Sequence, residues 1–268
     1  MNPQSSQPSE ASSTNTQTAH DQHGQYPQAT TVDDFRHNLA AVHARIEAAC
    51  QRAGRDPATV RLLPVSKTKG EDAIRAAYGA GCRFLGENKV QEAYGKWQAM
   101  QDLTDLKWSV IGHLQTNKVR QVLSKTVLIH SLDSLKLLDA VDFEAMKQRI
   151  VVEGLLEVNV AEEESKFGFL PEELWGLLNR LCQYKNLKIR GLMTVAPFTI
   201  NQEDNRAVFR KLKEISIDTR WNTLDNISMD ILSMGMTGDY SVAIEEGATI
   251  IRVGTGLFGA RNLGEDGQ

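Results

Sequence analysis

Strand-like and helix-like segments alternate eight times along this chain, and that alternation constrains the fold more than any other feature of the sequence. The strand-like runs are 60–65, 84–85, 107–112, 127–130, 151–160, 189–195, 227–233 and 249–253. Alternating βα units give parallel strands joined by helical crossovers, and eight of them in roughly 240 residues match a closed (β/α)8 barrel. The sequence therefore predicts an α/β protein with a single (β/α)8 TIM barrel, and an open doubly wound sheet is the second choice.

One additional helix is expected before the first strand. Residues 33–52 place apolar side chains on one helical face, and Thr31 and Asp33 are the candidate caps. The helices between the strands are expected at 71–80, after Asn88 to about residue 100, at 115–124, at 134–147, from 171 onward, at 204–215 and at 240–246. After the last strand only residues 254–268 remain, too few for a closing helix. We therefore expect the first helix to cover that gap, and no second substantial domain.

Residues 1–31 differ in composition from the rest of the chain. They are mostly Ser, Gln, Thr, Asn, Pro and Ala, so they cannot bury enough apolar surface to offset the entropy of ordering. We expect a disordered polar tail over 1–31 and the barrel over 32–268. His20 and His23 could hold a metal weakly, but a solvated tail is the better interpretation.

Charge and cysteine content exclude several classes of function. The net charge is −4 and the pI about 5.9, which gives no electrostatic signature for nucleic acid or an anionic membrane. Cys50, Cys82 and Cys182 form no CxxC pair, so neither a disulfide framework nor a zinc site is indicated. No apolar run approaches the roughly 18 residues of a membrane span, and no secretory signal is present. We expect a cytoplasmic monomer with no nucleic-acid, membrane or metal partner.

Active sites of barrels form where strands end, so polar residues at those ends are the candidates for chemistry. They are Ser66 and Lys67, Glu87 and Asn88, His113, Ser233 to Gly235, and Arg252 to Thr255. Lys67 closes a buried apolar strand, where desolvation or another cation can free its amine to form a Schiff base. The plainer alternative is that Lys67 marks the point where the strand meets solvent, and Lys69 competes for any role. His113 is assigned no catalytic role.

Two glycine-containing segments and one arginine indicate an anionic ligand. After the seventh and eighth strands come Gly235, Thr237 and Gly238, then Gly254, Thr255 and Gly256, where barrels often hold phosphate on backbone amides. Ordinary tight turns are the alternative. Arg252 lies in an otherwise apolar strand and needs either a ligand or a buried carboxylate. Because the first and eighth strands are neighbours in a closed barrel, Lys67 and Arg252 together suit a carbonyl compound that carries a phosphate.

Several motifs resemble one known family. They are Val65-Ser66-Lys67-Thr68, Gly86-Glu87-Asn88, the segment 111–118, the segment 232–236, and Arg252-Val253-Gly254-Thr255 with Phe258-Gly259. In their order, spacing and residue identities they resemble the pyridoxal phosphate homeostasis proteins, also called proline synthetase co-transcribed homologues. The resemblance runs from about residue 33 to 261. The resemblance implies the amino-terminal barrel of alanine racemase without its second, β-rich domain.

The resemblance also implies a role for each matching residue. Lys67 would carry pyridoxal phosphate as an internal aldimine, Arg252 would face the pyridine nitrogen, and Asn88 would lie near the ring. The phosphate would be held by Ser233, by the amides around Met234 and Gly235, and by Gly254 with Thr255. This chain departs from the family pattern at Lys89, where tyrosine is common, at Gly70, where proline is common, and at Thr237, where serine is usual.

The function implied is a carrier of pyridoxal phosphate that takes part in vitamin B6 homeostasis without strong catalytic activity. An arginine at the pyridine nitrogen cannot accept the proton that makes this cofactor an electron sink, so carbanion chemistry is damped. Apoenzymes that depend on pyridoxal phosphate are the expected recipients. The alternatives are a weak amino-acid racemase, a Schiff-base aldolase that uses Lys67 without a cofactor, and a phosphate-binding barrel without covalent chemistry.

Overall fold

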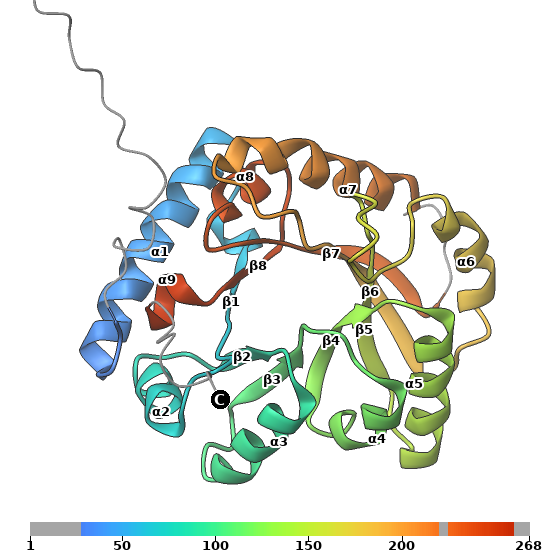
Figure 1. Cartoon of the computed structure of the whole chain (residues 1–268), viewed down its shortest axis with the longest axis horizontal. Coiled ribbons are helices and arrows are strands. Elements are labelled where there is room, and N and C mark those ends of the chain that lie inside the picture. The colour runs from blue at the N-terminus through green and yellow to red at the C-terminus, as the bar shows by residue number, and fades with distance from the viewer. Residues whose placement is uncertain (1–27, 220–224, 260–268) are drawn as a thin grey trace, which may run out of the picture.

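A computed structural model describes residues 28–219 and 225–259, and in it eight parallel strands form the predicted barrel (Figure 1). The strands are β1 (Arg61–Pro64), β2 (Phe84–Glu87), β3 (Lys107–Val110), β4 (Thr126–Leu132), β5 (Val152–Glu157), β6 (Leu187–Met193), β7 (Ile227–Met236) and β8 (Ile250–Val253). Their order in the sheet is β1-β8-β7-β6-β5-β4-β3-β2. A single parallel bridge between Val65 and Gly86 joins the edge strands β1 and β2. The barrel prediction is confirmed.

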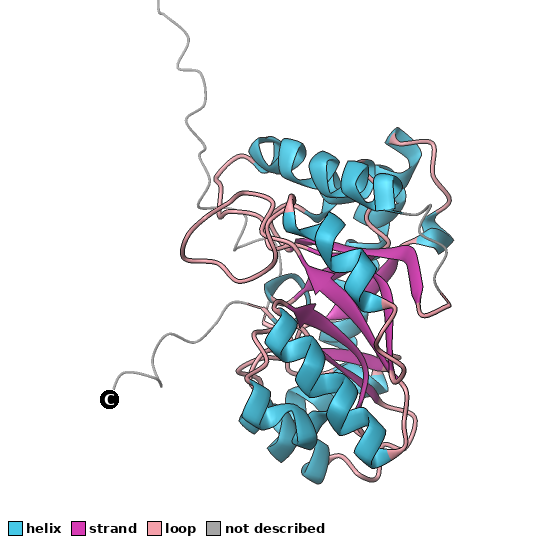
Figure 2. Cartoon of the chain, turned by 90° about the vertical axis from the view of Figure 1, so that its right-hand side faces the viewer, coloured by secondary structure: helices cyan, strands magenta, loops and turns pink. Residues whose placement is uncertain are grey.

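Helices follow the strands and surround the barrel, as the side view in Figure 2 also shows. They are α1 (Val32–Arg52), α2 (Glu71–Gly79), α3 (Val90–Ala99), α4 (Val119–Val122), α5 (Leu135–Gln148), α6 (Glu173–Leu181), α7 (Arg206–Thr219), α8 (Tyr240–Glu245) and α9 (Thr255–Phe258). Three short 3-10 helices complete the described elements: η1 (Pro57–Thr59), η2 (Thr116–Lys118) and η3 (Gln202–Asn205). The segment after β8, expected to be too short for a closing helix, forms one helical turn as α9.

Helix α1 closes the barrel exterior beside β8, as predicted. Thr31 and Asp34 form a reciprocal capping box at its start, so two otherwise unpaired amides are satisfied. Phe35 packs edge-on against Phe258 of α9 with ring centroids 4.9 Å apart, and the Asn38 side chain donates to Leu257 O at 2.9 Å. Figure 1 shows α1 running along α8 and α9.

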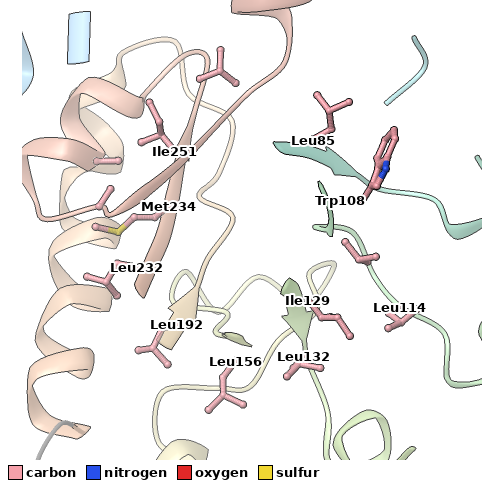
Figure 3. Close-up of a cluster of buried hydrophobic side chains, with 14 of the residues drawn as sticks. Leu85, Trp108, Leu114, Ile129, Leu132, Leu156, Leu192, Leu232, Met234 and Ile251 are labelled. Atoms are coloured by element: carbon pink, nitrogen blue, oxygen red, sulfur yellow. The ribbon is translucent and has the colours of Figure 1, made fainter. Parts of the chain in front are cut away.

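Side chains alternate between two apolar layers because successive strand residues point to opposite faces of the sheet. The larger layer lies between the sheet and the helices, and Figure 3 shows part of it, including Leu156, Leu232 and Ile251. A smaller cluster fills the barrel interior and consists of Leu63, Leu128, Leu155, Met193 and Ile250. Residues that alternate with the outer layer therefore point into the barrel.

Strand β7 is longer than predicted. Ser233, Met234 and Gly235 were expected to follow the seventh strand, but β7 continues to Met236. Ser233 pairs with Ile250 and Met236 pairs with Arg252, so three steps on β7 match two on β8 and form a bulge. Gly235 has φ +89°, and a Cβ there would lie 2.6 Å from Ala243 Cβ. Only glycine allows this bend and the close approach of α8.

The predicted polar tail falls mostly outside the described residues, and so do His20 and His23. Residues 28–31 are placed, and Ala29 is buried against the core. Across residues 28–219 and 225–259, no helix has the length and apolar character required to cross a membrane. The same residues contain no group of three His, Cys, Asp or Glu side chains suited to a metal ion.

Candidate functional site

A layer of polar side chains lies inside the barrel, next to the apolar interior cluster. It consists of His130 on β4, Glu157 on β5, Ser233 on β7 and Arg252 on β8, and we call it the polar layer. Each of these residues alternates with a side chain of the outer apolar layer, which directs it inward. Because all four lie at or near the carboxyl ends of parallel strands, the polar layer belongs to the end of the barrel where active sites form.

Arg252 donates three hydrogen bonds, two to Ser233 on β7 and one to the residue that follows β6. Its Nη1 donates to Ser233 O and to Ser233 Oγ, both at 2.7 Å, and its Nη2 donates to Thr194 O at 2.8 Å. Burial lowers the pKa of Arg252 to about 10, and the negative charges of Asp239 and Glu157 oppose that shift. The guanidinium is therefore still charged at neutral pH, fixed in direction and shielded from water.

The Ser233 hydroxyl links Arg252 to His130. His130 Nδ1 lies 2.8 Å from Ser233 Oγ, and its Nε2 has no hydrogen-bond partner among the described residues. Burial, with the charge of Arg252 as a second cause, lowers the pKa of His130 to about 3. The ring is therefore neutral at physiological pH. The sequence analysis did not single out His130, although its place directly after three apolar residues of the predicted strand, 127–129, was a usable signal.

Glu157 is the other residue of the polar layer that sequence reasoning missed. Its side chain is buried, and burial together with the nearby charge of Asp133 raises its pKa to about 7, while Arg252 acts in the opposite direction. A carboxyl that changes charge near neutral pH inside a barrel end is typical of functional sites. The missed signal was a single acid within the apolar run 154–158.

Lys67 lies two residues beyond the Val65 bridge and is half-buried. Strand β1 pairs with β8, and Val65 N donates to Val253 O at 2.9 Å, so Lys67 and the Gly254–Thr255 segment share the same edge of the barrel. The amides of Gly254 and Thr255 donate to no acceptor in the described part of the chain. This edge thus combines an amine with backbone donors available to an anion.

The two glycine-containing segments are tied to each other. Gly256 N donates to Thr237 Oγ1 at 3.3 Å, which connects the segment after β8 to the one after β7. Asp239 holds the segment after β7, because its carboxylate accepts from Met236 N at 2.6 Å and from Asn205 Nδ2 at 2.9 Å. The predicted phosphate segments are therefore adjacent and fixed.

The surroundings of three predicted site residues indicate what each of them could contribute. The side chain of Met234 packs in the outer apolar layer (Figure 3), so only its backbone faces the site. The Ser233 hydroxyl is occupied by Arg252 and His130. Asn88 is half-buried, and its backbone lies so close to Gly112 that a Cβ at residue 112 would be 2.6 Å from Asn88 O.

His113 and Glu87, two further polar residues expected at strand ends, both have protein partners. His113 Nδ1 lies 2.5 Å from Asp133 Oδ2, and its ring stacks on Phe167 at 3.9 Å between centroids. Glu87 is almost completely buried and forms an ion pair with Lys96. Strand β3 ends at Val110, two residues before the predicted end, so His113 lies in the following loop.

Comparison with known proteins places this geometry in a family. The family described as "Alanine racemase, N-terminal domain" matches residues 37–262. A "Pyridoxal phosphate homeostasis protein" of Aquifex aeolicus is 48% identical over 223 residues, which are 83% of this chain and 96% of the relative.

Solved structures agree with this assignment. PipY of Synechococcus elongatus, solved with PLP bound, has a TM-score of 0.70 and 36% identity, and the match covers 80% of this chain and all of PipY. An alanine racemase of Clostridium difficile shares the fold alone, with a TM-score of 0.67 and 12% identity over 87% of this chain and 61% of the racemase. The chain belongs to the pyridoxal phosphate homeostasis proteins, a family with the fold of the alanine racemase N-terminal domain.

Proposed function

We propose that this protein binds pyridoxal 5'-phosphate, attaches it to Lys67 as a Schiff base, and takes part in intracellular vitamin B6 homeostasis. One observation carries the proposal: the Lys67 amine, the buried Arg252 guanidinium and the amides of Gly254 and Thr255 all come from the neighbouring strands β1 and β8 and the residues that follow them. An amine suits an aldehyde, and backbone amides suit a phosphate. The name of the Aquifex relative and the ligand of PipY support the same reading.

The donor set fits each part of this cofactor. Lys67 would hold the aldehyde carbon, and the amides of Gly254 and Thr255, with those around Met234 and Gly235, would hold the phosphate. Arg252 would face the pyridine nitrogen, and Asn88 would lie beside the ring. Ser233 would contribute mainly by fixing Arg252, since its hydroxyl and carbonyl both accept from that guanidinium. When bound, the cofactor supplies a reactive aldehyde and an electron-accepting ring.

Arg252 also supports a carrier rather than an efficient enzyme. It is positively charged at neutral pH and its Nη atoms are committed to carbonyl and hydroxyl oxygens, so it offers the ring nitrogen a donor and no proton acceptor. A ring nitrogen without its own proton stabilises a substrate carbanion poorly. We therefore propose a cytoplasmic, monomeric carrier that passes the cofactor to pyridoxal phosphate-dependent apoenzymes and has little racemase activity.

Borohydride reduction with peptide mass mapping tests the attachment. The protein is incubated with pyridoxal phosphate, its visible absorption is recorded, and the reduced pyridoxyl adduct is located in wild type, Lys67→Ala and Lys69→Ala. Lys69 is a matched control because it lies two residues from Lys67 in the same loop. We expect the adduct on Lys67 in wild type and Lys69→Ala, and none at this loop in Lys67→Ala.

Two further assays separate the alternatives. Turnover of alanine enantiomers at rates typical of enzymes, about 1 per second or more, would make the protein a racemase. Turnover of an aldol substrate by colourless protein would indicate an aldolase that uses Lys67 directly. Absence of an adduct on every lysine would overturn the Schiff base and leave a phosphate-binding barrel.

A further inference from the structure

A buried network of charged groups lies directly beneath the loop that carries Lys67. Its centre is Lys96 on α3, whose side chain is 10% exposed. Lys96 Nζ lies 2.8 Å from Glu87 Oε1 and 2.6 Å from Glu92 Oε1, and it donates to Ser66 O at 2.7 Å. A buried lysine with three acceptors is held firmly, because each lost contact would leave a charged group unpaired away from water.

The network forms hydrogen bonds with the residues on both sides of Lys67. On one side Ser66 Oγ donates to Glu87 Oε1 at 2.5 Å, and on the other Thr68 N donates to Glu92 Oε1 at 2.5 Å. The two carboxylates that receive these bonds are the same two that pair with Lys96. Lys67 itself is thus placed between two anchored neighbours, and one cation holds both anchors together.

The backbone at Thr68 explains why such anchoring is needed. Thr68 has φ +63°, and this left-handed conformation carries an energetic cost for a β-branched residue. A loop with such an unfavourable backbone conformation would shift to a more favourable one unless contacts with other segments hold it in place. The bond from Thr68 N to Glu92 does so only while Glu92 is itself held by Lys96.

Glu87 makes the network dependent on Lys96 in a second way. Burial raises the pKa of Glu87, whereas Lys96 and the Ser66 hydroxyl act to lower it. One of its oxygens, Oε2, is buried with no hydrogen-bond partner among the described residues. Removal of Lys96 would therefore favour the neutral form of Glu87 and weaken its hold on Ser66.

A second ion-pair network, centred on Arg206, lies away from the predicted site residues in sequence. Arg206 on α7 bridges Glu203, Glu245 and Glu246, but none of these residues adjoins a predicted site residue in sequence. The network of Lys96 differs because its bonds end on Ser66 and Thr68.

We propose that Lys96, together with Glu87 and Glu92, positions Lys67 so that its amine reaches an aldehyde whose phosphate is held by the segments after β7 and β8. The inference rests on the proposed function. The neutral Lys67 amine attacks the aldehyde carbon, a C–N bond forms, and loss of the carbonyl oxygen as water completes the C=N bond. No oxidant or reductant is required. Because the phosphate contacts come from other strands, the network governs the covalent step and not retention of the phosphate.

The test compares covalent capture with non-covalent binding in Lys96→Met and Glu92→Gln. Capture is the rate at which absorbance of the Schiff base appears with pyridoxal phosphate, checked by borohydride trapping on Lys67. Non-covalent binding is the Kd of pyridoxamine 5'-phosphate, which has the same ring and phosphate and no aldehyde. Lys147→Met is the matched control, because it removes a lysine from an exposed ion pair with Glu144 on α5.

We expect capture to fall about tenfold or more in both variants, because small displacements of a reacting group cost that much, while the Kd for pyridoxamine phosphate changes less than about twofold. The control should match wild type in both measurements. If Lys96→Met does not fold, Glu92→Gln still decides, because it leaves the Lys96–Glu87 pair intact.

Two results would overturn the inference and leave the proposed function standing: unchanged capture in the variants, or an equal loss in capture and in pyridoxamine phosphate binding. Failure of the wild-type protein to trap the cofactor on Lys67 would instead overturn the proposed function, and this inference with it.

Discussion

Glu157→Gln should make the protein more stable at pH 8 than wild type, although it removes a charge from a polar layer. In the folded chain the pKa of Glu157 is raised from 4.5 to about 7, mainly by burial. Between those two values the folded state binds the proton and the unfolded state does not, so wild-type stability decreases as pH rises. At about 1.36 kcal/mol per pH unit, the full decrease is about 3 kcal/mol. Gln, which does not titrate, avoids it.

The measurement is the free energy of unfolding in urea from pH 4.5 to pH 8, followed by tryptophan fluorescence and circular dichroism. The quantity of interest is the free energy of unfolding of the variant minus that of wild type, because the contributions of other titrating groups cancel in this difference. It should rise by about 3 kcal/mol across this range and level off above pH 7.5. Glu153→Gln is the control: Glu153 lies on the same strand, is partly exposed, and pairs with Arg190 at 3.4 Å. For Glu153→Gln, the free energy of unfolding relative to wild type should stay constant over this pH range to within about 0.5 kcal/mol.

A flat difference for Glu157→Gln would refute the reasoning, since it would mean that the carboxyl ionises at the same pH in the folded and unfolded chain. A difference that falls with pH would refute it more strongly. That result would require the charged form of Glu157 to be the one that the polar layer stabilises.

Three further perturbations give separate checks. His130→Gln should show the opposite slope, its free energy of unfolding relative to wild type falling by about 2 kcal/mol from pH 4.5 to 6.5. The reason is that the folded pKa of His130 is lowered to about 3, so only the unfolded state charges in that range; the same urea series measures it. Ser233→Ala should lower the free energy of unfolding in urea at pH 7 by about 1–3 kcal/mol, since Arg252 and His130 each lose a buried partner. A decrease below about 0.5 kcal/mol, which is the size typical of surface substitutions, would contradict this. Gly191→Ala should lower the unfolding midpoint sharply or prevent folding, because Gly191 has φ +153° and a Cβ there would clash with the β7 backbone. By contrast, Gly95→Ala on the open surface of α3 should raise the free energy of unfolding by about 0.5–1 kcal/mol.

The parts of this structure that were predictable from sequence are those encoded locally. Strand periodicity and helix spacing depend on neighbouring residues, which is why all eight strands were located and only their ends moved. Arg252 was identified because an arginine between apolar residues is conspicuous within its own strand. Glu157 carries the same local signal, and His130 follows three apolar residues, but both lie inside predicted strands, whereas the candidate residues were those at the strand ends. Their meaning also depends on distant partners: His130 meets Ser233, which lies 103 residues away.

Lys96 shows the stricter limit. On its helix it resembles any lysine that pairs with a glutamate four residues earlier. Its contact with Ser66 depends on α3 packing beneath the loop after β1, across 30 residues of sequence. No sequence periodicity indicates that contact, so the proposed positioning of Lys67 could be inferred only from the folded chain.

Each part of the proposed site is anchored by a different segment, and that separation has a consequence. Lys67 is anchored through α3, Arg252 through β6 and β7, and the phosphate segments through Asp239 and Asn205. Damage to one anchor should therefore weaken one kind of contact, to the aldehyde, the ring or the phosphate, and spare the others. This arrangement would suit the proposed carrier, because a covalent bond to Lys67 could form and break while the phosphate contacts persist. Cofactor release would then depend on two independent sets of contacts, and variants in α3 and in the segment after β7 should change the covalent and non-covalent parts of binding separately.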